Sequence, residues 1–365
     1  MSIAEGRLSR ADLLKAGAAG ALGLTFAGPA LARGVRIEST TLNMLTWSDH
    51  YANDQLKAVA KAVSIQGRPT LFSDNADAYL KIKQTHGQFD IVSGDALWVP
   101  KYHKDGLTTS FPLSEIGTSK QLYSIARSFP FWKDGSNYMG YPFSWSTVQI
   151  YYNPKYVKTA PTSWHALLDK KYKGKISLEN IPTDMMAIAA RATGAKKPYS
   201  MSKAEISRAK AFLKAFKPNV LKLASQNNEV VRALADGSAW IGITNLGTDD
   251  RVKDAGGPVV KTAYPKEGTI GFIDSEQIVK ASKNHDAFFK FENQMQQAKW
   301  IAKNFITNGR PLFNEKAYKI LVNTGHGDRA RRQYYNKPEN ALKMTIKGPA
   351  GDEQAYVDAF NEVFG

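Results

Sequence analysis

The sequence predicts an α/β fold with a parallel-biased sheet and helices on both of its faces. Short runs rich in β-branched and aromatic residues alternate with amphipathic helical segments along most of the 365 residues, and this alternation is typical of such sheets. The chain is also 43% hydrophobic, which is enough for a substantial core in each of two domains of ordinary size.

The predicted elements of the first half begin after the N-terminal segment. Strands are expected at residues 41–47, 69–72 and 89–92, and helices at residues 53–63 and 76–85. Each strand is followed by a polar or glycine-containing loop, as expected where strands and helices alternate.

A strand end and a new helix are predicted in the middle of the chain. The run from Val148 to Tyr152 stops at Asn153-Pro154, which redirects the backbone. Thr162-Ser163 can then cap a helix that carries Trp164 on its apolar face. The pattern afterwards repeats. A strand starts at residue 176, helices follow at 183–193, 203–216 and 229–236, and strands at 239–244 and 269–273.

The N-terminus has the features of a secretory signal. Three basic residues precede an apolar run over residues 16–27, and Ala30-Leu31-Ala32 has the form of a signal peptidase site. We therefore expect residues 1–32 to be removed and the mature protein to be periplasmic. The segment from Ser9 to Lys15 is similar to a twin-arginine signal, but Ala11 stands where the second arginine belongs, so the export route stays open.

Charge and cysteine content exclude several functions. The chain has no cysteine, which excludes thiol catalysis and cysteine metal sites. Its net charge of +16 could suggest nucleic-acid binding. The basic residues are nevertheless spread over predicted helix faces, and clusters such as 329–332 are short, so a solvated surface is the better interpretation and no nucleic-acid partner is expected.

Two passages carry a resemblance to a known family. Residues 142–157, PFSWSTVQIYYNPKYV, and residues 161–176, PTSWHALLDKKYKGKI, are followed much later by PKEGTIGFIDS at residues 265–275. These strings resemble the spermidine/putrescine-binding branch of the periplasmic solute-binding proteins. The resemblance implies a two-lobe, Venus flytrap fold with two strands crossing between the lobes and a ligand cleft between them.

The resemblance also implies a domain organisation. Residues 33–148 would form the first part of lobe 1 and residues 149–273 the first part of lobe 2. Residues 274–325 would return to lobe 1, and residues 326–365 would form a C-terminal segment on lobe 2.

Candidate ligand contacts in the first lobe follow predicted strands. Trp47 and Tyr51 match the family's W-x-x-Y loop with one residue inserted, and Trp47 could stack on a ligand or pack between lobes. Asp95 follows the strand 89–92, where the family places a small polar contact, although a turn or helix-cap role is an equal alternative. Trp145 lies on the first crossing and could contribute to the cleft wall.

The second lobe and the second crossing supply the other candidates. Asp184 sits where the family carries an amine-binding acid, but it also opens a helix. Asp274 is expected at the end of the crossing strand, where a ligand ammonium, with the ring of Phe272, is a natural partner. The alternative for Asp274 is a salt bridge to a lysine or arginine of the chain. Thr244 and Asn245 stand in place of the family's Trp-Asn pair.

Departures from the family pattern leave the ligand open. Ile181 replaces an expected aspartate and Leu97 a tyrosine. A polyamine needs an acid for each ammonium, because an unpaired buried charge costs several kcal/mol. On the family resemblance, a polyamine-like small organic amine is still the first expectation. An amino acid, an opine or another small solute is the alternative, with Arg232 or Arg251 as possible carboxylate partners.

An enzyme is not expected. The six histidines form no HExxH or other metal spacing, and the sequence has neither a G-x-S-x-G elbow nor a Walker A string. Paired acids such as Asp184 and Asp274 could serve a secreted hydrolase, which is a remote alternative. We expect a monomer without cofactor or metal, whose partners are the ligand and an inner-membrane ABC permease with a separate ATPase subunit.

Overall fold

The computed structural model describes residues 40–342 and 344–365, without the side chains of residues 340 and 341. The predicted signal peptide, residues 1–32, lies outside the described residues. Within them, no helix combines the length and the apolar character needed to cross a membrane.

The elements have the following bounds. The strands are β1 (Thr40–Thr46), β2 (Ile65–Leu71), β3 (Ile91–Asp95), β4 (Thr108–Thr109), β5 (Lys133–Asp134), β6 (Asn137–Tyr138), β7 (Tyr141–Tyr152), β8 (Ile176–Glu179), β9 (Val220–Ala224), β10 (Ile241–Asn245), β11 (Lys261–Ala263), β12 (Ile270–Val279) and β13 (Thr345–Ile346). The α-helices are α1 (Asn53–Val63), α2 (Asn75–Thr85), α3 (Trp98–Lys104), α4 (Pro182–Ala192), α5 (Lys203–Phe216), α6 (Asn227–Ala235), α7 (Thr248–Asp254), α8 (His285–Met295), α9 (Ala298–Asn308), α10 (Glu315–Asn323), α11 (Gly327–Arg332), α12 (Pro338–Ala341) and α13 (Glu353–Phe364).

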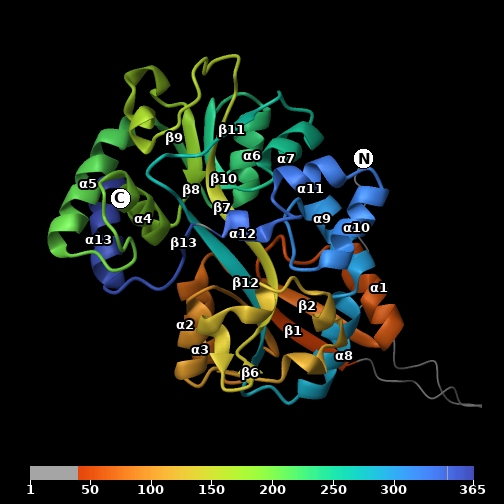
Figure 1. Cartoon of the computed structure of the whole chain (residues 1–365). Helices are drawn as coiled ribbons and strands as arrows, with labels where there is room; N and C mark the ends of the chain where they lie inside the picture. Colours follow the sequence, from red (N-terminus) through yellow and green to blue (C-terminus); the bar gives the residue numbers. More distant parts are fainter. Residues whose placement is uncertain (1–39, 343) are drawn as a thin grey trace, which may run out of the picture. The chain divides into compact units, whose positions relative to one another are not determined.

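Two groups of parallel strands are joined by two long antiparallel strands. The strand order is β2-β1-β3-β12-β7-β10-β8-β9. β1 runs parallel to β2 and β3, and β8 runs parallel to β9 and β10, whereas β12 and β7 are antiparallel to each other and to their outer neighbours. We call β2-β1-β3 with its helices the first lobe and β10-β8-β9 with its helices the second lobe. Figure 1 shows β7 and β12 side by side between them.

The crossing strands belong to both lobes and are buried throughout. All twelve residues of β7 and all ten of β12 are buried. The first part of β7 pairs with β12, and its last part, from Val148 to Tyr152, pairs with β10. Such strands must satisfy every polar side chain inside the protein, which places strong demands on the acids of β12.

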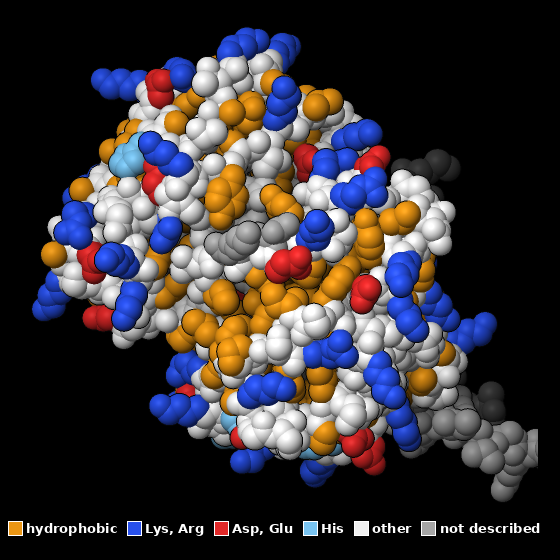
Figure 2. Space-filling view, viewed as in Figure 1, with side chains coloured by type: hydrophobic (Ala, Val, Ile, Leu, Met, Phe, Trp, Pro, Cys, Tyr) orange, Lys and Arg blue, Asp and Glu red, His pale blue; other side chains and the backbone are white. Residues whose placement is uncertain are grey.

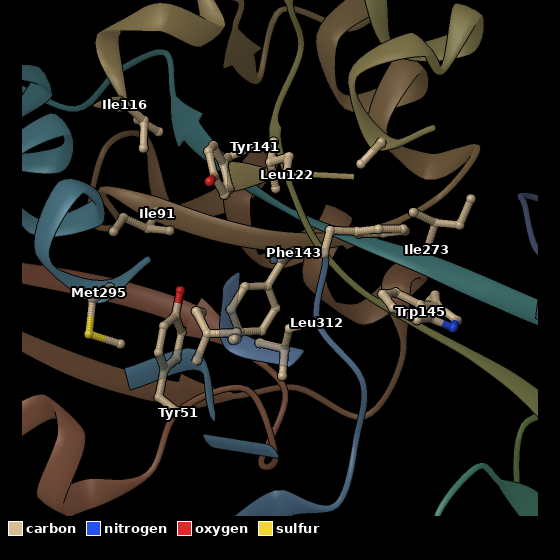
Figure 3. Packing of buried hydrophobic residues seen from close by; sticks show 14 of the residues in the cluster. Tyr51, Ile91, Ile116, Leu122, Tyr141, Phe143, Trp145, Ile273, Met295 and Leu312 are labelled. Carbon is tan, nitrogen blue, oxygen red and sulfur yellow. The ribbon is translucent and has the colours of Figure 1, made fainter. Parts of the chain in front are cut away.

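Each lobe has a core on both faces of its sheet. In the first lobe, Met44 packs with α1 and α8 residues while the next residue, Leu45, packs with α2 and α3 residues. In the second lobe, Ile150 packs with α4, α5 and α13 residues, and Tyr151 packs with α6 residues. This alternation is the period of two that a strand imposes. Figure 3 shows part of the first-lobe core, where Tyr51, Phe143 and Leu312 meet.

Several predicted elements agree closely with the structure because their end signals are local. The helices predicted at 53–63 and 203–216 have these bounds in α1 and α5. In α5, Ser202 and Glu205 form a reciprocal capping box that satisfies the first free amide groups.

Three expectations were wrong in detail. The helix expected after Ser163 consists of two 3-10 segments, Trp164–Leu168 and Lys170–Tyr172, because Asp169 interrupts it and caps the second. β2 starts at Ile65 rather than at residue 69, since pairing with β1 extends it through Gly67. β12 continues to Val279, because β3 and β4 pair with it beyond residue 273.

The C-terminal residues pack in two places. α11 contacts α10, whereas α13 packs against α4 and α5 of the second lobe. The domain boundaries at residues 148, 273 and 325 stay a prediction. In the face seen in Figure 2, Lys and Arg side chains are spread around the periphery and form no single stripe, in agreement with a solvated surface.

Candidate ligand site

A cavity of about 310 Å³ lies where strand ends of the two lobes meet. Trp47 follows β1, Asp95 ends β3, Glu179 ends β8 and Asn245 ends β10, and all four line it. The other lining residues are Ser48, Asp49, Ser73, Asp74, Asn180, Ile181, Ser225, Gln226, Asn227, Asn228, Arg251, Phe272, Asp274, Arg310 and Lys347. Open α/β sheets bind ligands at the carboxyl ends of their parallel strands, so this cavity is the candidate site.

A smaller cavity of about 190 Å³ continues the first one toward α4. The two share Trp47, Asp74, Asp95, Ile181 and Lys347, and the smaller one is also lined by Asp184. A wider hollow of about 850 Å³ lies elsewhere, beside α8 and α9. Its described lining includes three lysines and no acid, so it does not match the predicted amine site.

Arg310 is the centre of the charged wall. Its Nη1 lies 3.0 Å from Asp274 Oδ2 and its Nη2 lies 3.0 Å from Asp49 Oδ1. Burial alone would raise the pKa of Asp49, but the charges of Arg310 and His50 outweigh it and lower that pKa. Arg310 thus places a cation beside two carboxyl groups of the cavity.

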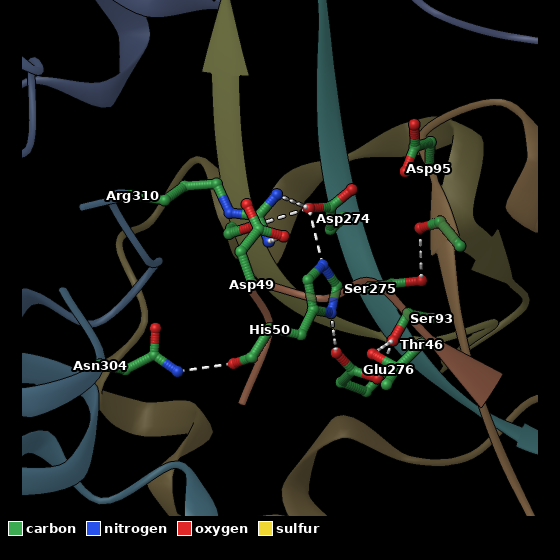
Figure 4. A network of polar contacts seen from close by, with 12 residues as sticks. Thr46, Asp49, His50, Ser93, Asp95, Asp274, Ser275, Glu276, Asn304 and Arg310 are labelled. Atoms are coloured by element: carbon green, nitrogen blue, oxygen red, sulfur yellow. Dashed lines mark hydrogen bonds and ion pairs between the residues drawn. The ribbon is translucent and has the colours of Figure 1, made fainter. Parts of the chain in front are cut away.

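His50 extends this network into the first lobe. Its Nε2 lies 3.0 Å from Asp274 Oδ2 and its Nδ1 lies 2.8 Å from Glu276 Oε1. Ser93 donates to the other oxygen of Glu276, and Ser144 donates to Asp274 at 2.7 Å. Figure 4 shows the chain of contacts from Arg310 to Ser93. These bonds pair both oxygens of Glu276 and Oδ2 of Asp274, while Oδ1 of Asp274 is buried without a hydrogen-bond partner among the described residues.

Asp95 has a different environment from Asp274, although the two residues are direct partners across β3 and β12. Its backbone amide donates to Asn75, while its own Oδ1 is buried without a hydrogen-bond partner among the described residues. Burial, followed by the charge of Asp274, raises the pKa of Asp95 well above its usual value. Burial also raises the pKa of Asp274, so the protein interior disfavours a negative charge on both of these neighbouring groups.

Asp184 is paired with a lysine from the C-terminal segment. Its Oδ2 forms an ion pair with Lys347 Nζ, and its Oδ1 accepts a hydrogen bond of 2.9 Å from the Tyr199 hydroxyl. Lys347 Nζ also lies 5.2 Å from the centre of the Phe272 ring, and the Arg310 guanidinium lies 5.5 Å from the same centre. The cation-π position that Phe272 offers is thus taken by two cations of the chain.

Four ionisable lining residues have no ion pair within 4.0 Å in the described part of the chain: the acids Asp74, Asp95 and Glu179, and the base Arg251. Arg251 donates to Asn227 at 2.5 Å and to Thr248 at 2.9 Å, and its Nε is buried without a partner among described residues. Burial raises the pKa of Glu179 and lowers the pKa of Arg251. The cavity wall therefore offers one guanidinium, that of Arg251, and three carboxyl groups without an ion pair, of which Glu179 is the one in the second lobe.

Six of the nine residues predicted from the sequence lie at these cavities. Trp47, Asp95, Asn245, Phe272 and Asp274 line the larger one, and Asp184 lines the smaller one. Trp47 stands against Phe72, with ring centres 4.2 Å apart, and lies in both cavity walls.

The other three predicted residues are placed elsewhere and need correction. Tyr51 is in the first-lobe core beside Phe143, because the residue inserted into its loop, His50, is the one that turns toward β12. Trp145 is fully buried against Phe313. Thr244 is also fully buried and accepts a hydrogen bond from Asn227. Alternation along β7 and β10 turns the side chains of Trp145 and Thr244 away from the cavity.

The site also contains residues that the sequence did not single out. Glu179 could have been found by the rule that identified Asp95, since it ends β8, the strand whose start the sequence predicted at residue 176. Arg310 and Lys347 have no local signal, and they reach the cavity because the chain returns to it late. Of the two arginines proposed as carboxylate partners, Arg251 lines the cavity and Arg232 is exposed on α6. Among the described residues, no group of three or more His, Asp or Glu side chains is arranged to hold a metal ion.

Comparison with known families agrees with this geometry. The model of the bacterial extracellular solute-binding proteins matches residues 71–319, more than half of the chain. The chain belongs to this family. Its members are transport components rather than enzymes, which confirms the expectation that this protein is not an enzyme.

Individual relatives extend the comparison over most of the chain. The spermidine/putrescine-binding periplasmic protein of Escherichia coli K12 is 27% identical over 289 residues, which is 78% of this chain and 80% of that protein. A putative spermidine/putrescine ABC transporter from Listeria monocytogenes superposes with a TM-score of 0.77 at 23% identity, over 89% of this chain and 98% of the other. The PBP MotA from A. tumefaciens B6, in complex with glucopine, superposes with a TM-score of 0.69 at 20% identity, over 89% and 99%. The predicted periplasmic-binding-protein fold is confirmed.

Proposed function

We propose that this protein is a periplasmic substrate-binding component that delivers a small organic amine to an ABC permease, and that the ligand carries an anionic group beside its ammonium. One observation carries the proposal. The predicted amine-binding acids Asp184 and Asp274 are already paired with Lys347 and Arg310, while the larger cavity is lined by Arg251 and by the acids Asp74, Asp95 and Glu179 without an ion pair among the described residues.

A polyamine fits this wall less well than a zwitterion does. Asp184, Asp274 and Asp49 each have a cation of the chain beside them, and a ligand ammonium at one of these acids would displace a buried cation at a cost of several kcal/mol. Asp74, Asp95 and Glu179 have no ion pair, but a polyamine that used them would leave the buried Arg251 guanidinium without a counter-anion.

A zwitterion can use an acid and the arginine that have no ion pair in the wall. Its ammonium can pair with Glu179, and its carboxylate can take the guanidinium of Arg251, whose planar group suits two-point binding of a carboxylate. Trp47 can cover the apolar part of the ligand from the first lobe.

The relatives support both parts of the proposal. The named curated relative binds spermidine and putrescine, which are amines, and a solved relative holds glucopine. The ligand class proposed here is therefore within the range of solutes that proteins of this fold take.

Binding from both lobes provides a means of signalling. Glu179 and Arg251 belong to the second lobe, and Trp47 and Asp49 belong to the first. A ligand that contacts both stabilises the closed arrangement, and the permease would read that arrangement. The predicted signal peptide would direct the chain to the periplasm.

The test is a thermal-shift screen of the mature protein followed by calorimetry. Amino acids and opines are each compared with the matching amine and the matching acid, and polyamines are included. A ligand at 100 times its dissociation constant adds about 2.7 kcal/mol to stability. We expect the compound with both charges to bind more tightly than either counterpart.

Two variants connect the result to the site. Arg251→Met should weaken binding of the zwitterion by about 2 to 5 kcal/mol, while Arg232→Met, at an exposed arginine of α6, should leave it unchanged. Tight binding of polyamines with no response to zwitterions would overturn the ligand class. Binding that survives Arg251→Met unchanged would remove this residue from the site.

A further inference from the structure

Lys347 and its neighbours form an ammonium-binding site that the chain fills itself. The Asp184 carboxylate pairs with Lys347 Nζ, and the Phe272 ring centre lies 5.2 Å from the same atom. A carboxylate and an aromatic face are the two features that bind an ammonium group inside a protein.

The lysine is held in place by its backbone. Its amide donates to the Gly271 carbonyl on β12 at 2.8 Å, and its own carbonyl accepts from Leu97 at 3.3 Å. Only 8% of the residue is exposed, and it lines both cavities. The Lys347 ammonium is therefore a fixed charge of the binding site and not a mobile surface group.

We propose that Lys347 is a specificity-determining residue whose ammonium occupies the position that the second ammonium of a diamine would take. This inference rests on the proposed function and deepens it: the site accepts a ligand with a single ammonium and rejects diamines of similar length. Rejection follows because a second ligand ammonium would either lie beside Lys347, with like charges in contact, or displace it from Asp184.

Removing the lysine should reverse this selectivity. In Lys347→Met, the Asp184 carboxylate loses its cation and becomes a free ammonium site at the end of the cavity. The probes are putrescine and γ-aminobutyrate, which have the same carbon number and differ in one end group. We expect calorimetry to show that Lys347→Met binds putrescine about ten-fold or more tightly than the wild type does.

Two control variants isolate the charge. Lys347→Arg keeps a cation beside Asp184 and should reject putrescine as the wild type does. The double variant Asp184→Asn, Lys347→Met removes both charges, and the gain in putrescine binding should disappear. If circular dichroism shows that Lys347→Met is unfolded, Lys347→Gln, which keeps a hydrogen-bond donor for Asp184, carries the same test.

The outcomes separate this inference from the proposed function. A folded Lys347 variant that gains no affinity for putrescine, or a double variant that keeps the gain, overturns the role of Lys347. The wild type's response to zwitterions tests the proposed function independently, since the gain is measured against putrescine alone. A wild type that binds putrescine tightly and loses it in Lys347→Met also overturns the inference.

Discussion

Asp274→Ala tests whether the buried network holds the two strands and the β1 loop together. Asp274 is fully buried and accepts contacts from Arg310 at 3.0 Å, His50 at 3.0 Å and Ser144 at 2.7 Å. Removing one partner of a buried ion pair costs about 3 to 5 kcal/mol, because the remaining charge stays desolvated.

The structure places the expected loss at the lower end of that range. Arg310 keeps its pair with Asp49, and His50 keeps Glu276, so neither is left without an acid. We therefore expect Asp274→Ala to lower the free energy of unfolding by about 3 kcal/mol. The sequence suggests instead that Asp274 serves the ligand, in which case the fold would be unaffected.

Urea denaturation of the ligand-free protein, followed by circular dichroism, measures the effect. The matched control is Asp254→Ala, since Asp254 pairs with Arg329 at 3.2 Å on the surface and is 60% exposed. Exposed pairs contribute at most about 1 kcal/mol. If Asp274→Ala and Asp254→Ala destabilise the protein equally, the network does not support the fold and the reasoning fails.

Three further perturbations follow from the structure. Burial raises the pKa of the Glu292 carboxyl from 4.5 to about 7, so the stability that its protonated form contributes is present below about pH 4.5 and is lost as the pH rises through 7. Relative to Glu292→Gln, the wild type should lose about 3 kcal/mol of unfolding free energy across that range in urea titrations. Parallel pH profiles of the two proteins would contradict this. Trp47→Ala should weaken ligand binding by at least about 1 kcal/mol and remove the ligand-induced change in tryptophan fluorescence, whereas unchanged affinity and emission would return Trp47 to a packing role. In Gly271→Ala, the new Cβ would overlap the Ser146 carbonyl oxygen, so thermal unfolding should show a loss of about 1 to 3 kcal/mol or more, and a stability equal to the wild type would mean that the crossing strands can separate.

The predicted elements show how far local signals reach. The helix bounds of α1 and α5 could be read from the sequence, because caps and apolar periodicity are properties of neighbouring residues. β12 was predicted too short, since its second half is a strand only through pairing with β3 and β4. The helix predicted after Ser163 was wrong for a different reason: the interruption by Asp169, which is a local signal, was not recognised.

In the candidate site, too, the residues that local order identifies differ from those that only the tertiary structure identifies. The rule that ligand contacts follow strand ends depends on local order, and three of the residues it selected, Trp47, Asp95 and Asn245, line the cavity. It could not assign Tyr51 or Trp145, because the face to which a strand or loop residue points depends on the register with its neighbours. Similarly, it identified Asp274 without its partners.

The sequence therefore established the alternating α/β pattern, the two crossing segments and the position of most strand-end loops, since each of these depends on residues close together in the chain. Folding alone established which charges are already paired. His50 and Asp274 are 224 positions apart, and Asp49 and Arg310 are 261 apart. Partners at such separations leave no local pattern, because they meet only when the chain returns to the same sheet edge. For this reason the acids could be recognised as binding candidates from the sequence, while only the three-dimensional arrangement shows that Asp184 and Asp274 already have cations of the chain beside them.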